Sequence, residues 1–184
     1  MSAAGLIGRK DLTCGIYARP MSNEPLPIGP DRDAMIRLTR ETWPDAVVAT
    51  IESAAFFSLD EKHWPNFATV VWTDEHDDGA PSKLSRPGVY RLNIGVGKET
   101  FQGLVGDITE PDYAGFDRIL PHPVYAKQRW ISILNPGEAT LQKTVIPLLS
   151  EARTAASGTS GTCGPPGSTV DPGRTPAQNA YCVG

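Results

Sequence analysis

The sequence has little cysteine, and it has no long apolar run. Its three cysteines, Cys14, Cys163 and Cys182, all lie near the ends of the 184-residue chain. Neither a disulfide framework nor a cysteine metal site can therefore hold the central part together. No stretch approaches the ~20 apolar residues that a membrane-spanning helix needs. The short apolar stretch at residues 3–8 precedes its basic neighbours, which reverses the order of a secretory signal. These absences favour a cytoplasmic protein.

A basic run is also missing. The net charge is −4, and residues 31–153 contain 13 Lys and Arg against 18 Asp and Glu, which gives −5 for this part. Proteins bind nucleic acid largely by placing clustered cations on phosphates. An acidic domain is therefore a poor candidate for a nucleic-acid partner, and no membrane partner is expected. The partner classes that remain are a small molecule or another protein.

Glycine and proline are abundant, with 18 and 17 residues, mainly towards the ends of the chain. The composition predicts a disordered extension at residues 1–30, a single domain at 31–153, and a disordered tail rich in Gly, Pro, Ser, Thr and Ala at 154–184. Met21 is a second candidate for the start of translation.

Hydrophobic periodicity predicts an antiparallel sheet with helices. The first helix begins at Asp31, a residue that caps helices, and ends at Trp43 because Pro44 disfavours helical geometry there. Strands come next in a run and do not alternate one by one with helices, which favours α+β over a doubly wound sheet. We predict about five antiparallel strands flanked by N- and C-terminal helices. The expected strands are 46–51, 54–59, 67–73, 89–96 and 130–134, and the later helices are 98–105 and 138–151.

The strand at 89–96 alternates, as expected of a strand with one buried face. Its apolar face carries Tyr90, Leu92 and Ile94. Arg91 and Asn93 lie on the other face and are predicted to point away from the core. In the last helix, an apolar stripe is formed by Leu141, Val145, Leu148, Leu149 and Ala152. Pro147 lacks a backbone donor and should kink that helix.

Two segments resemble known binding motifs but lack residues or spacings that those motifs require. Residues 95–100 read GVGKET. A phosphate-binding loop needs Gly where this chain has Leu92, and Ser or Thr where it has Glu99. Two glycines allow a turn there, and a weaker anion site at the start of the following helix stays open. Residues 74–78 read DEHDD, without the spacing of a calcium loop. We interpret that run as a solvated hairpin turn, with adventitious metal binding as the less favoured alternative.

The densest group of chemically able residues lies at 117–130. His122 is held between two prolines, and Tyr125 and Lys127 follow closely. Together with Arg91 and Asn93, these residues are our candidates for binding a small ligand. The alternative, which we favour, is a rigid connection in which Tyr125 and Trp130 anchor the core and His122 is hydrogen bonded to the backbone. No Ser or Cys stands where a nucleophile would be activated, so no catalytic, cofactor-binding or metal-ligating residue and no cofactor is predicted.

Two segments carry a resemblance to a known family. Residues 86–101, RPGVYRLNIGVGKETF, and the stretch from HPVYA at 122–126 to LNP at 134–136 resemble small bacterial proteins described as domain of unknown function 6194. The likeness covers about residues 33–153 and implies no activity. A looser likeness at 125–133 is similar to the YjbR-like proteins, which have a helix-flanked antiparallel sheet and a suggested role in DNA binding. This chain departs from them in the position of its histidine and in its acidity.

Three functions follow as hypotheses. The leading one is a non-catalytic binding or interaction module, because no nucleophile, metal set or cofactor loop is assembled. The first alternative is a small-ligand-binding protein or an enzyme with a polar pocket around His122. The second is YjbR-like nucleic-acid binding through Lys127, Arg129 and Lys143. Whether the protein is an enzyme stays open, with a non-catalytic role favoured.

Overall fold

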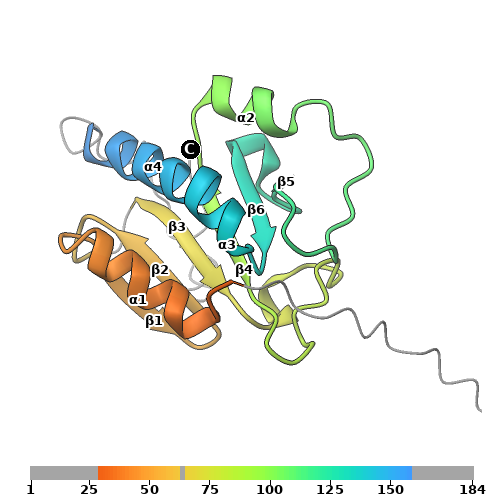
Figure 1. Ribbon diagram of the computed structural model, residues 1–184, viewed down its shortest axis with the longest axis horizontal. Coiled ribbons are helices and arrows are strands. Elements are labelled where there is room, and N and C mark those ends of the chain that lie inside the picture. The colour runs from red at the N-terminus through yellow and green to blue at the C-terminus, as the bar shows by residue number, and fades with distance from the viewer. Residues whose placement is uncertain (1–28, 63–64, 159–184) are drawn as a thin grey trace, which may run out of the picture.

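The computed structural model describes residues 29–62 and 65–158, which contain one six-stranded antiparallel sheet with helices (Figure 1). The strand order is β1-β2-β3-β4-β6-β5, and every strand pair is antiparallel. The predicted α+β fold is confirmed. The strands are β1 Val47–Ile51, β2 Ala54–Ser58, β3 Asn66–Val71, β4 Arg91–Gly95, β5 Leu120–Pro121 and β6 Trp130–Leu134. The two-residue strand β5 was not expected, because two residues are too short to show a period.

Helix α1, Arg32–Thr42, begins and ends where the sequence predicts. The Asp31 carboxylate accepts a hydrogen bond from the Ala34 backbone N–H at 2.7 Å, which satisfies one of the free donors of the first turn. Trp43 ends the helix with non-helical geometry, as expected before Pro44.

The C-terminal helical region differs from a simple kinked helix. It consists of α3 Glu138–Thr140, a π-helical stretch Leu141–Val145 and α4 Ile146–Gly158. Pro147 cannot donate to the carbonyl four residues earlier, and the wider π turn just before it accommodates the lost bond. All five members of the predicted apolar stripe are buried. The expected domain boundary at residue 153 lies inside α4, which continues to Gly158.

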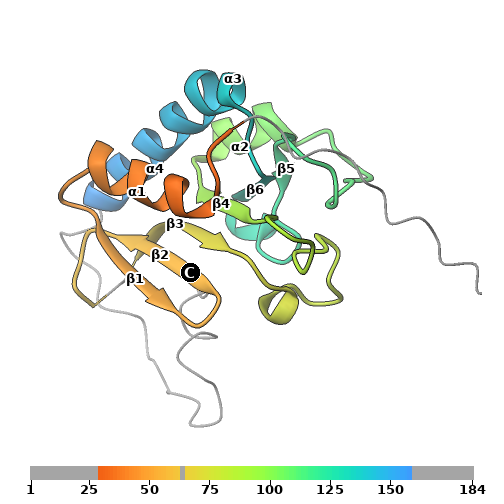
Figure 2. The same cartoon turned by 60° about the horizontal axis from the view of Figure 1, so that its bottom comes forward.

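The main core lies between the sheet and its helices. Figure 2 shows α1, α4 and α2, Lys98–Val105, on one face of the sheet. Buried side chains from the sheet and helices meet there, including Met35, Phe57, Leu92, Ile133, Val145 and Leu149. Whether the polar side chains of β4 are exposed depends on what covers the opposite face of the sheet.

That opposite face is covered by residues 72–90, which we call the covering segment. Its Leu84 and Val89 pack against Phe56, Val71 and Leu134 of the sheet in a second apolar cluster. Arg91 and Asn93 do lie on the face opposite Leu92, as predicted, but they are not exposed. They are 1% and 0% exposed. The expectation of one buried face was wrong because the covering segment lies over the second.

The predicted disordered ends beyond these limits and the three cysteines lie outside the described residues. Within residues 29–62 and 65–158, no helix is long and apolar enough to cross a membrane.

Candidate functional site

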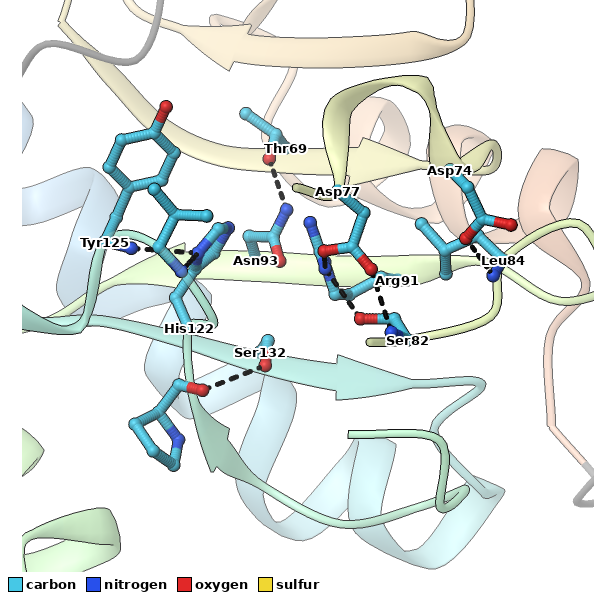
Figure 3. Close-up of polar contacts among 12 residues, drawn as sticks. Thr69, Asp74, Asp77, Ser82, Leu84, Arg91, Asn93, His122, Tyr125 and Ser132 are labelled. Carbon is cyan, nitrogen blue, oxygen red and sulfur yellow. Dashed lines mark hydrogen bonds and ion pairs between the residues drawn. The ribbon is translucent and has the colours of Figure 1, made fainter. Parts of the chain in front are cut away.

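Polar side chains form a buried layer between the sheet and the covering segment. We call it the buried polar layer, and each member is at most 2% exposed. Its members are Thr69, Asp77, Ser82, Arg91, Asn93, His122 and Ser132. Strand pairing places Thr69, Asn93 and Ser132 side by side on β3, β4 and β6. Figure 3 shows these side chains together with those that descend from the covering segment.

Arg91 and Asp77 form a buried ion pair at one side of the layer. The Arg91 Nη1 donates to Asp77 Oδ1 and also, at 2.7 Å, to Ser82 Oγ. The other carboxylate oxygen of Asp77 accepts the Ser82 backbone N–H at 2.8 Å. The charge of Arg91 is therefore balanced within the fold, and the ion pair joins the covering segment to β4.

Asp74 holds part of the covering segment in place through hydrogen bonds to its backbone. Its carboxylate accepts the backbone N–H groups of Leu84 at 2.6 Å and Ser85 at 3.0 Å. Burial alone would raise the pKa of Asp74, but the hydrogen bonds from Ser85 and Leu84 outweigh it and lower that pKa. The interpretation of residues 74–78 as a solvated hairpin turn was wrong. They form a short 3₁₀ helix, Asp74–His76, and Asp77 is buried.

His122 is neutral and held by the backbone. Its Nδ1 accepts the N–H groups of Val124 and Tyr125, each at 3.1 Å. Burial, and then the positive charge of Arg91, lower the pKa of His122 well below 6.5. A neutral ring whose Nδ1 accepts must carry its proton on Nε2. The predicted alternative of a backbone partner for His122 is confirmed.

Two atoms of the layer have no hydrogen-bond partner among the residues that the structure describes. They are the Nε of Arg91 and the Oδ1 of Asn93. The amide nitrogen of Asn93 donates to Thr69 Oγ1 at 2.9 Å, and its oxygen points away from that contact. A buried polar atom without a partner carries a desolvation penalty, so such atoms are uncommon in folded proteins.

The structure brings three of the five predicted ligand-binding residues into one layer: Arg91, Asn93 and His122. Tyr125 lies beside them, its ring centre 4.9 Å from that of His122. Lys127 does not join the layer. It is exposed on the one-turn helix Ala126–Gln128.

Sequence reasoning missed four members of the layer, Thr69, Asp77, Ser82 and Ser132, and one residue near it, Tyr113. Asp77 stood in the acidic run that was interpreted as solvated, and Ser82 gave no signal. Burial raises the pKa of Tyr113, while Arg91 lowers it and Asp77 raises it. The Tyr113 hydroxyl is thus within electrostatic range of the ion pair, and its side chain is only partly buried. The sequence does contain a hint of an ion pair, because Asp77 lies 14 residues before Arg91. No local pattern indicates that the two side chains are in contact.

The turn at residues 95–100 is occupied by the chain itself. The Glu151 carboxylate of α4 accepts the Gly97 backbone N–H at 3.1 Å and the Thr100 hydroxyl at 2.9 Å. A negative group thus already stands at the start of α2, where the helix dipole favours one. The anion site considered there is filled by an internal carboxylate.

An open groove lies apart from the layer. It has a volume of about 620 Å³ and is lined in part by Asp31, Arg32, Trp72 and Ser85. The Arg32 guanidinium lies over the Trp72 ring at 4.7 Å, so this partly buried ring already has a cationic neighbour. Within the described ranges, no three His, Cys, Asp or Glu side chains are grouped as metal ligands would be.

Fold and site together define a class of protein: an α+β domain whose sheet is covered by helices on one face and by a polar layer under a long segment on the other. The chain belongs to the family of unknown function DUF6194, whose family model matches residues 30–161. No curated protein and no solved structure matches it. The looser likeness to YjbR-like proteins therefore stays a hypothesis.

Proposed function

We propose that this protein is a non-catalytic module that binds a small polar molecule in the buried polar layer. The observation that carries the proposal is the pair of unpartnered atoms, Arg91 Nε and Asn93 Oδ1. They belong to residues on the same face of β4, two positions apart. Each would gain a hydrogen bond from a ligand, and neither has one from the described residues.

The hydrogen bonds of the layer favour binding over catalysis. Ser82 Oγ accepts from Arg91, and Ser132 Oγ donates to the Pro121 carbonyl at 3.4 Å. The Nδ1 of His122 is taken by two backbone N–H groups. A catalytic serine needs a base within hydrogen-bond reach, whereas the hydrogen bonds of these two hydroxyl groups are made with Arg91 and the Pro121 carbonyl. The layer offers positioned donors and acceptors, which would orient a bound ligand.

Ligand entry would pass Tyr113. This residue lies on the connection between α2 and β5, is partly exposed, and is within electrostatic range of both Arg91 and Asp77. The same connection is joined to the covering segment where Arg86 Nη2 donates to the Ala114 carbonyl at 3.0 Å. We propose that displacement of Tyr113 opens the layer beside the ion pair.

A thermal-shift screen of the full chain tests the proposal. The compounds are sugars, amino acids, carboxylates, amides, nucleosides and phosphate esters, each with the unmodified protein and with two variants. A ligand at about 100 times its dissociation constant adds about 2.7 kcal/mol to the free energy of unfolding. We expect a compound whose shift disappears in Asn93→Ala and persists in Lys127→Ala, the exposed control.

Two results would contradict the proposal. One is the absence of a shift with every compound class. The other is a set of shifts that Asn93→Ala leaves unchanged, because binding would then occur away from the buried polar layer.

A further inference from the structure

The geometry points to an uncharged ligand that presents a carbonyl oxygen and an N–H group, as a primary amide does. This inference rests on the proposed function, since it names the ligand class of the same site. A buried arginine next to a histidine is the pattern that usually indicates a carboxylate or phosphate ligand. The charges in the buried polar layer argue against that interpretation.

The layer is already electrically balanced. The positive charge of Arg91 faces the carboxylate of Asp77, in a pair whose side chains are 1% and 0% exposed. His122 adds no charge, because burial and Arg91 hold its pKa well below 6.5. Thr69, Asn93 and Ser132 are uncharged. The layer as a whole therefore carries one positive and one negative charge.

An anionic ligand would disturb this balance. It would bring a second negative charge close to Asp77 in a region without solvent, where like charges repel strongly. A buried charge without its own partner is costly, and Arg91 already has a partner. A neutral ligand leaves the ion pair intact.

The two unpartnered atoms define a complementary pair of groups. Arg91 Nε is a donor and requires an acceptor, whereas Asn93 Oδ1 is an acceptor and requires a donor. Arg91 and Asn93 stand two positions apart on the same face of β4, so a ligand lying along that face can meet the two groups with two different atoms. An amide group provides its acceptor and its donor on two such atoms.

Matched pairs of an amide and the corresponding acid test the inference. We would compare nicotinamide with nicotinate, benzamide with benzoate, and glutamine with glutamate, by the shift in melting temperature of the full chain. The amide of at least one pair should raise the melting temperature, while its acid should not. The shift should be lost in Asn93→Ala and retained in Lys127→Ala.

A direct measurement covers the case in which Asn93→Ala does not fold. In the unmodified ¹⁵N-labelled protein, the Arg91 Nε–H resonance should move on addition of the active amide and stay in place with its acid. The Asn93→Ser variant, which keeps a small polar side chain, provides a second thermal test.

The outcomes separate this inference from the proposed function. If acids alone give a shift, and Asn93→Ala abolishes it, the binding site stands and the uncharged ligand class is wrong. If amides give a shift that Asn93→Ala leaves unchanged and the Arg91 resonance does not move, both are wrong. If no member of any pair gives a shift or moves that resonance, the uncharged ligand class is overturned, while the wider screen still decides the proposed function.

Discussion

Removing the Asp77 carboxylate should destabilise the fold more than any other single change to a polar side chain of the covering segment. Asp77 holds the guanidinium of Arg91 and the backbone N–H of Ser82, and both partners are buried. In Asp77→Ala the charge of Arg91 remains buried without compensation. Breaking a buried ion pair in this way costs about 3–5 kcal/mol, which is a large fraction of the ~5–15 kcal/mol that stabilises a typical domain.

Urea unfolding at neutral pH measures this loss. The double variant Asp77→Leu with Arg91→Met should recover much of it, because it removes both charges and restores apolar contact. The loss in Asp77→Ala should also change little with added salt, since neither side chain reaches solvent.

Asp45→Ala is the matched control, because it breaks an ion pair with Arg153 whose side chains are 55% and 28% exposed. Its effect should be much smaller and should depend on salt. An Asp77→Ala protein as stable as Asp45→Ala, or a double variant less stable than either of its component single variants, would refute the reasoning on the buried ion pair.

Three further predictions concern single side chains. The fold lowers the pKa of His122, so the folded protein takes up this proton less readily than the unfolded chain. As pH falls below ~6.5 the unfolded state therefore binds more protons, and the free energy of unfolding should fall by up to ~1.4 kcal/mol per pH unit. Urea unfolding measured against pH should show a flatter slope in His122→Asn. Glu151→Ala should lower the free energy of unfolding by about 1 kcal/mol, as loss of a helix cap does, and an equal loss in Glu99→Ala would contradict that role. Asp74→Ala should speed amide hydrogen exchange at Leu84 and Ser85, and unchanged rates would show that the carboxylate does not hold the segment.

Local signals were sufficient for most of the fold. The cap at Asp31 and the proline at 44 set the limits of α1, and the β-branched and aromatic runs gave five strands to within about two residues. Strand β5 was missed because its two residues are defined by pairing with Ser132 and Ile131 and not by their own pattern.

The candidate site was only partly predictable. Alternation along β4 placed Arg91 and Asn93 on one face, and the two prolines drew attention to His122. Their burial could not be predicted, because it depends on a covering segment whose sequence, rich in Gly, Pro, Ser and Asp, is typical of a surface loop. That segment is held down by Asp77 and Leu84, whose partners lie on strands elsewhere in the chain.

Several acidic side chains have structural roles that the net charge of the chain does not reveal. Asp74 binds backbone N–H groups 10 and 11 residues away, Asp117 binds that of Gly137 at 2.7 Å, and Glu151 reaches Gly97 across 54 residues. Asp77 completes the set by pairing with Arg91. Each carboxylate thus fixes a loop or a helix start at a distance along the chain. An excess of acids that is partly engaged inside the fold says little about the charge of a partner, and the uncharged ligand that we propose is consistent with this.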